Sequence, residues 1–104
     1  MGEYDIVISD MAKQDIRDTA AYIRCELQEP AVAQQTSEAI LDAILTLEWM
    51  PARASLVRDK RLAGQHIRRL IVKNYSVFFR INEAEQSVEI VRILYSRRDW
   101  SSIL

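Results

Sequence analysis

Three segments in the C-terminal half of the chain are rich in β-branched and aromatic residues and follow one another with very short gaps. They span residues 66–72, 75–82 and 87–96. This composition is typical of β-strands. The gaps hold two residues (73–74) and four residues (83–86), which suits tight turns between antiparallel neighbours. The pattern therefore predicts an antiparallel three-stranded meander.

The preceding half of the chain predicts one strand and two helices. Residues 4–9 read as the strand, and Asp10 is suited to cap a helix that ends near Gln28. Pro30 fits the first turn of a second helix, and Pro51 ends it. Apolar residues at helical spacing mark the inner faces: Ile16, Ala20, Ile23, Leu27, Val32, Thr36, Ile40, Ala43 and Leu47, widened by Leu41, Ile44 and Leu45. Because only one or two residues separate the two predicted helices, the helices should form an antiparallel hairpin.

The order of the predicted elements, β-α-α-β-β-β, defines the fold class. A helical hairpin and a sheet each have an apolar face, and both are buried when the hairpin packs on one face of the sheet. We therefore predict an α+β fold with a mostly antiparallel, twisted sheet, formed as a single domain over residues 1–104. Residues 51–65 show no clean periodicity, and we expect a basic connecting loop with room for one short helical turn.

Alternation along the strands assigns each residue to one face of the sheet. The sets predicted to face the helices are Val77, Phe79 and Ile81 in one strand and Val91, Ile93 and Tyr95 in the next. The opposite face then carries Phe78, Arg80, Arg92 and Leu94. An outward face that is both cationic and apolar is typical of a docking surface. The alternative is that residues 51–65 or the C-terminal residues cover these side chains.

The net charge of −1 hides a strong asymmetry between the two halves of the chain. Residues 1–50 hold three basic and ten acidic residues, a net charge of −7. Residues 51–104 hold eleven basic and five acidic residues, a net charge of +6. Such asymmetry favours an acidic or polyanionic partner for the basic half. The alternative is a solvated surface with ion pairs between the halves.

Several classes of protein are excluded by what the sequence lacks. One cysteine, Cys25, cannot form an internal disulfide, and with one histidine, His66, it cannot build a zinc site. Glycines only at positions 2 and 64 provide no phosphate-binding loop, so we expect neither a metal nor a cofactor. No apolar run approaches the ~20 residues of a membrane span. The N-terminus is acidic rather than basic, so we expect no signal peptide and a cytoplasmic protein.

The densest basic motif is Tyr95-Ser96-Arg97-Arg98-Asp99-Trp100, at the end of the last predicted strand. A second pair, Arg68-Arg69, lies in the first strand of the meander. The meander should gather these guanidinium groups on one sheet, where they could bind phosphates or stabilise a phosphorane. We include Tyr95 and Arg97 in the predicted binding surface. The simpler alternative is an ion pair of Asp99 with a neighbouring arginine and an anchoring role for Trp100.

Two long stretches of the sequence resemble the RelE/ParE toxin superfamily. They are IVISDMAKQDIRDTAAYI (residues 6–23) and IRRLIVKNYSVFFRINEAEQSVEIVRILYSRRDW (residues 67–100). The residues that carry the resemblance are Ser9, Ala12, Asp15 and Tyr22 around the first helix, Pro51 after the second, Arg68 and Leu70 before Asn74-Tyr75, and Val91 to Tyr95 followed by Arg97-Arg98-Asp99. Their order and spacing, rather than any single motif, are specific.

The resemblance implies a growth-inhibiting toxin of a type II toxin–antitoxin module. A co-expressed antitoxin would wrap the toxin and cover its sheet or its helical hairpin. The toxin would reach operator DNA only through the antitoxin. RelE-like members of the superfamily cleave messenger RNA in the ribosomal A site, whereas ParE-like members inhibit DNA gyrase.

Two departures from the ribonuclease pattern favour the ParE-like function. RelE-like ribonucleases usually carry an arginine just after the tyrosine that opens the middle strand, where this chain has Ser76. They also often end with a catalytic tyrosine or histidine, and the tail from Trp100 to Leu104 has neither. We therefore expect a toxin that acts by binding DNA gyrase or a similar target.

Two alternatives stay open. The first is a ribosome-dependent, metal-independent messenger RNA endoribonuclease. In that case the resemblance assigns Arg98 to the scissile phosphate and Arg68, Arg69 or Arg80 to its positioning. The second is a degenerate toxin kept as a repressor partner or interaction module, which the intact set of arginines disfavours.

Overall fold

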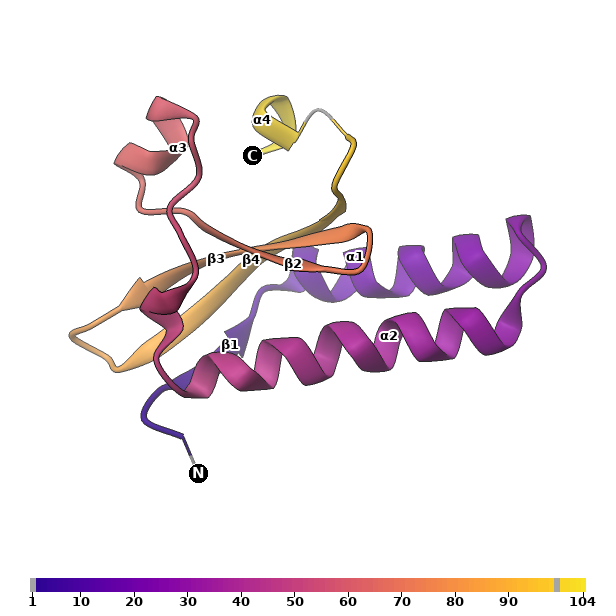
Figure 1. Ribbon diagram of the computed structural model, residues 1–104, viewed down its shortest axis with the longest axis horizontal. Coiled ribbons are helices and arrows are strands. Elements are labelled where there is room, and N and C mark those ends of the chain that lie inside the picture. Colours follow the sequence, from indigo (N-terminus) through magenta and orange to yellow (C-terminus); the bar gives the residue numbers. More distant parts are fainter. Residues whose placement is uncertain (1, 99) are drawn as a thin grey trace.

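The computed structural model describes residues 2–98 and 100–104, and its elements follow the predicted order (Figure 1). Strand β1 (Asp5–Ile8) leads into helix α1 (Asp10–Ala21), which continues as a π-helical turn, η1 (Tyr22–Glu26). Helix α2 (Pro30–Leu45) returns alongside α1 and completes the helical hairpin. The meander consists of β2 (Arg68–Val72), β3 (Tyr75–Asn82) and β4 (Ser87–Tyr95).

The sheet has the order β1-β4-β3-β2. β1 runs parallel to β4, and the other two pairs are antiparallel. The predicted α+β fold with a mostly antiparallel sheet is therefore confirmed. Between α2 and β2 lie two short 3-10 helices, η2 (Thr46–Glu48) and η3 (Pro51–Arg53), and the helix α3 (Lys60–Gly64), which is the short helical turn predicted there. A last turn, α4 (Trp100–Ile103), follows β4.

The cap of the first helix is Ser9 and not the predicted Asp10. The Ser9 hydroxyl oxygen accepts a hydrogen bond from the backbone N–H of Ala12 at 3.0 Å, which satisfies an unpaired first-turn donor. The same hydroxyl donates to the carbonyl oxygen of Val91 in β4 at 2.9 Å. One side chain therefore starts α1 and fixes it to the sheet.

The apolar stripes of the hairpin differ from the prediction at its tip and on its outer side. Leu27 is exposed because η1, a π-helical turn, adds a residue per turn and changes the direction of the side chains that follow. Val32, Leu41 and Leu45 are exposed as well. The buried residues of α2 are Ala33, Thr36, Ile40 and Ile44.

The sheet separates two buried clusters. The larger lies between the sheet and the helical hairpin and contains Phe79 and Ile93, as predicted, packed with Ile40 and Ile44 of α2. The smaller covers the opposite face, where α3 and α4 lie in Figure 1. Its buried members are Val57, Leu62, Ile67, Phe78 and Leu94, with Val91, Trp100, Ile103 and Leu104 packed against them.

A β-bulge in β4 breaks the alternation that predicted the two faces. Phe78 lies opposite Arg92 and Phe79 opposite Ile90, so Val91 is the extra residue. Ile90 consequently packs in the helix-facing cluster, and Val91 packs against the cluster on the other face. The predicted facing of Val91 toward the helices is therefore wrong.

None of the described helices is both long and apolar enough to cross a membrane.

Candidate functional site

The outward face predicted from alternation is not assembled in the structure. Phe78 is fully buried and Leu94 is 2% exposed, because α3 and α4 fold over them. Arg80 is exposed and pairs with Glu89 at 2.6 Å. Arg92 points to helix α1. The four side chains predicted to form one docking surface are therefore covered or separated, and the alternative in which residues 51–65 and the C-terminus cover that face is correct.

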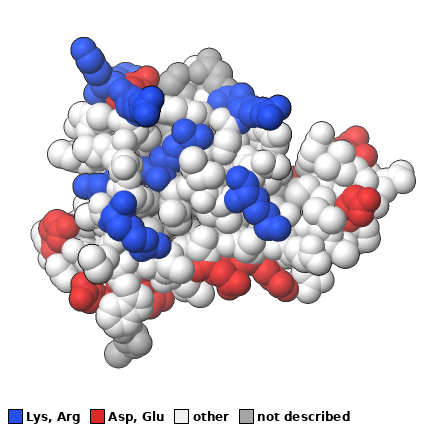
Figure 2. All heavy atoms as spheres, in the orientation of Figure 1, with Lys and Arg blue, Asp and Glu red and all other residues white. Residues whose placement is uncertain are grey.

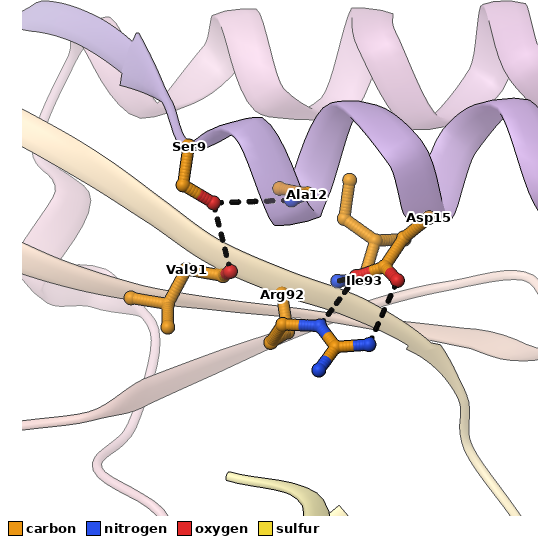
Figure 3. A network of polar contacts seen from close by, with 6 residues as sticks. All are labelled: Ser9, Ala12, Asp15, Val91, Arg92 and Ile93. Carbon is orange, nitrogen blue, oxygen red and sulfur yellow. Dashed lines mark hydrogen bonds and ion pairs between the residues drawn. The ribbon is translucent and has the colours of Figure 1, made fainter.

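A carboxylate from α1 holds Arg92 (Figure 3). Arg92 donates through Nε to Oδ2 of Asp15 at 2.8 Å and through Nη2 to Oδ1 at 2.9 Å. The backbone N–H of Ile93 donates to the same Oδ2 at 2.9 Å. Because β1 ends at Ile8, the Asp15 carboxylate pairs with the edge of β4 that β1 leaves open. The hydrogen bond to Asp15 raises the pKa of Arg92, against the effect of burial. Arg92 thus positions α1 on the sheet.

Three cationic side chains surround a small hollow at the end of the outer sheet face. The hollow measures about 140 Å³ and is lined by Arg69 and Ile71 of β2, by Lys73 and Asn74 of the turn, and by Tyr95, Ser96 and Arg97 at the end of β4. We call it the cationic hollow. It brings together two of the predicted binding residues, Tyr95 and Arg97, and one of the residues predicted to be catalytic in a ribonuclease, Arg69.

Arg69 is held in a fixed orientation beside the cationic hollow. Its Nε donates to the hydroxyl oxygen of Ser76 at 2.8 Å, and that hydroxyl shares a 2.9 Å hydrogen bond with Ser96. The guanidinium carbon lies 5.6 Å from the ring centroid of Trp100, within range of a cation–π interaction. Ser76, which the sequence marks only as a departure from the ribonuclease pattern, therefore orients Arg69. No local sequence signal reveals this contact, because it depends on the register between strands.

The other predicted catalytic arginines lie elsewhere. Arg68 donates through Nη1 to the carbonyl oxygens of Ala54 at 2.6 Å and Ala52 at 3.3 Å, so it holds the chain before α3. Arg98 is exposed and lines a different cavity from Arg69. Asp99 lies outside the described residues, and so does its predicted ion pair. The structure therefore places the three arginines in three environments.

A larger open groove of about 1180 Å³ lies between the tip of the hairpin and the end of the sheet. Tyr22, Leu27 and Val32 form much of its helical wall, and all three are exposed. In Figure 1 this tip extends beyond the sheet. On the sheet side, the rings of Tyr75 and Tyr95 pack edge to face with centroids 5.6 Å apart, and burial raises the pKa of Tyr75. We call this the tip groove.

The charges are distributed unevenly over the molecule. In Figure 2, lysines and arginines are spread over the upper and central part of the visible face, where Figure 1 shows α3 and the meander. Acidic residues follow the lower edge, where α2 lies. On this face the asymmetry between the halves of the sequence therefore gives a mainly basic centre and an acidic lower edge.

The cationic hollow can bind an anionic group. Among the described residues that line it, there is no histidine and no carboxylate to move a proton. Arginine stabilises negative charge well, but its pKa above ~12 makes it a poor proton shuttle. A helical hairpin on a four-stranded, mostly antiparallel sheet with a cationic end is the α+β architecture that the resemblance to the RelE/ParE toxins predicted.

The sequence comparison identifies the family. Residues 6–100 match the family described as ParE toxin of type II toxin-antitoxin system, parDE. This chain belongs to that family of toxins. The sequence has no significant match among curated proteins.

Solved structures of toxin–antitoxin systems share the fold. The chromosomal ParDE system from P. aeruginosa aligns with a TM-score of 0.73 at 16% identity, over 89% of this chain and 96% of that chain. The RelBE2 complex from Mycobacterium tuberculosis aligns with a TM-score of 0.60 at 18% identity, over 91% and 93%. A double arginine-to-alanine mutant of the E. coli toxin RelE, in the free state, aligns with a TM-score of 0.62 at 8% identity, over 99% and 93%.

Proposed function

We propose that this ParE-family toxin arrests growth by binding DNA gyrase or a similar target, and not by cutting messenger RNA. The observation that carries this proposal is that the described residues lining the cationic hollow include no histidine and no carboxylate that could move a proton. A metal-free ribonuclease must activate a 2′-hydroxyl, stabilise the phosphorane and protonate the leaving oxygen. The Nε of Arg69 donates to Ser76, Arg68 donates to backbone carbonyl oxygens, and Arg98 lines the neighbouring tip groove. Because gyrase is cytoplasmic, the proposal also places the toxin in the cytoplasm.

Purified gyrase provides the direct test. We expect the toxin to inhibit supercoiling of plasmid DNA, and Arg97→Ala to raise the inhibitory concentration about tenfold, since a charge-assisted hydrogen bond contributes roughly 1.5–3 kcal/mol. Arg17→Ala is the matched control, because Arg17 is an exposed arginine on the helical hairpin, where it contacts only Gln14 among the interactions described. Unimpaired supercoiling at high toxin concentration would contradict the proposal.

Primer extension on transcripts from induced cells tests the alternative. We expect no cuts positioned by codons. Codon-positioned cuts that disappear in the Arg98→Ala variant would establish the ribonuclease activity instead.

The tip groove is the surface that we propose for the main contact with the antitoxin. Leu27 lines the groove and is 53% exposed. Burying a large apolar side chain contributes roughly 1.5–3 kcal/mol, which makes such a groove a strong anchor for an apolar segment. Leu27→Glu should therefore weaken antitoxin binding by about a hundredfold in a calorimetric titration.

Leu45→Glu is the matched control for this test. Leu45 is also 53% exposed, but it lies at the other end of the hairpin, outside the tip groove. If Leu45→Glu weakened binding and Leu27→Glu did not, the antitoxin would contact the outer side of the hairpin rather than the groove.

A further inference from the structure

Strand β2 is an edge of the sheet, and only the first part of that edge is covered. The backbone N–H of Val57 donates to the carbonyl oxygen of Ile67 at 3.0 Å, and the N–H of Arg69 donates to the carbonyl oxygen of Ser55 at 3.2 Å. Leu56 forms an antiparallel bridge with Arg68. The chain that precedes Ser55 forms the 3-10 helix η3 and not an extended strand. Within the described part of the chain, no segment is paired with β2 beyond Arg69.

The open part of the edge is centred on Ile71. Backbone groups of an antiparallel strand point alternately toward one neighbour and the other. The C=O of Ile67 and the N–H of Arg69 form hydrogen bonds on the side of β2 that faces away from β3. Two residues further along the strand, the N–H and C=O of Ile71 therefore also point away from β3. The Ile71 side chain is 62% exposed. Proteins usually protect open edges with charges, bulges or covering segments, so an exposed isoleucine on an open edge indicates a site for another strand.

The surface next to this edge is cationic. Side chains two residues apart on a strand share a face, and Ile71 lines the cationic hollow together with Arg69, Lys73 and Arg97. A strand added to β2 would place every second side chain over the same face. Acidic side chains would then lie beside Arg69 and Lys73, and an apolar one beside Ile71.

We propose that the open edge of β2 at Ile71 takes an extended segment of the antitoxin with the pattern acidic–x–apolar–x–acidic. The segment adds a strand to the four-stranded sheet and places a carboxylate in the cationic hollow. Because Arg97, which we expect to contribute to gyrase inhibition, lines the hollow, this role in blocking the target rests on the proposed function. The antitoxin and the target then compete for one set of cations.

Two observations favour an acidic partner strand over a second copy of this chain. Pairing two β2 edges would bring Arg69, Lys73 and Arg97 of both copies together, and like charges at an interface oppose association. The tip groove and the cationic hollow also share Lys73, Asn74 and Tyr95. A partner chain that leaves the tip groove therefore reaches the edge of β2 by crossing the turn between β2 and β3.

Amide hydrogen exchange, followed by NMR on the free toxin and on the toxin–antitoxin complex, tests the backbone pairing. We expect the Ile71 amide to exchange about a hundredfold more slowly in the complex. Ile71→Pro removes the outward N–H without breaking the bonds to β3, which an edge strand tolerates. We expect it to raise the antitoxin Kd about tenfold, whereas Ile71→Thr, which keeps the N–H and the β-branch, should stay within about threefold.

The outcomes are distinguishable. Equal exchange of the Ile71 amide in both states overturns the proposal, even if Ile71→Pro fails to fold. Equal Kd values for wild type and a folded Ile71→Pro overturn it too. If light scattering shows a dimer of the free toxin that Ile71→Pro makes monomeric at unchanged antitoxin affinity, a second copy occupies the edge and the proposal is wrong. Gyrase inhibition is measured without antitoxin, so its failure is a separate result.

Discussion

Ser76 shows how a small buried side chain determines what a neighbouring arginine does. It is fully buried, and its hydroxyl lies between Arg69 and Ser96. An arginine at this position would have to bury its charge in the sheet or displace Arg69. The serine instead fixes the guanidinium group of Arg69 beside Trp100 at the cationic hollow. The departure from the ribonuclease pattern is therefore a structural feature of this site.

The pairing of Asp15 with Arg92 leads to a prediction for stability. Both side chains are largely buried, and the carboxylate accepts three hydrogen bonds. Asp15→Asn leaves Arg92 without a counter-charge and should lower the free energy of unfolding by about 2–4 kcal/mol, measured by urea denaturation. Asp18→Asn on the exposed side of the same helix should change it by less than about 0.5 kcal/mol. Equal effects of the two substitutions would contradict a special role for Asp15.

Phe79 gives a second prediction for stability. It is fully buried between the sheet and the hairpin. Phe79→Ala should cost about 3–5 kcal/mol of unfolding free energy, because it removes a core aromatic ring and leaves a cavity. Tyr22→Ala, at an exposed aromatic residue, is the comparison and should cost about 1 kcal/mol or less. A cost below about 2 kcal/mol for Phe79→Ala would show that the core is packed differently.

The helical hairpin is the element that creates the tip groove. Its first helix ends in a π-helical turn, and Gln28 then adopts a positive φ of 53°. The backbone N–H of Glu29 donates to the carbonyl oxygen of Ile23 at 3.1 Å and closes the helix end. Because the chain reverses direction within this turn, α2 begins at Pro30, directly after Glu29. The tip of the hairpin extends past the sheet in Figure 1, and the tip groove lies between the tip and the sheet.

Glycine substitutions test this account of the hairpin tip. Gln28→Gly should raise the free energy of unfolding by about 0.5–1 kcal/mol, since only glycine adopts this conformation without strain. The same substitution at Gln35, in the exposed middle of α2, should lower it by about 1 kcal/mol. Chemical denaturation of the two variants should thus give shifts of opposite sign. Destabilisation by Gln28→Gly would mean that the side chain, and not the backbone, matters there.

For the molecule as a whole, the charge asymmetry decides how partners approach. The acidic half of the sequence forms the hairpin side, and the basic half forms the meander and the segments that cover it. A dipolar molecule of this kind orients a charged partner before contact. An acidic antitoxin segment should therefore meet the basic side first.

The rate of association with the antitoxin tests this orientation. Raising the salt concentration from about 50 to 300 mM should lower the association rate constant about tenfold in stopped-flow measurements, because salt screens the field of the basic side. The dissociation rate constant should change by less than about threefold. A salt-independent association rate would rule out electrostatic steering.

Local patterns in the amino-acid sequence were sufficient to predict the order of elements, the hairpin and the helix-facing core. These features follow from periodicity and short connections, which is why Phe79, Ile93 and the strand limits of β3 were predictable. The sequence also placed Tyr95 and Arg97 among the candidate binding residues and Arg69 among the candidate catalytic residues, because they lie in basic motifs.

Long-range packing, by contrast, sets what covers the outer face of the sheet and which arginines stay available. Phe78 and Leu94 are buried because α3 and α4 return over them, and no local pattern encodes where a distant segment packs. The bulge at Val91 reverses the alternation through its pairing with another strand. Arg92 is bound by Asp15, 77 positions away in the sequence. Such contacts depend on the register and twist of the assembled sheet, which arise only when the chain has folded.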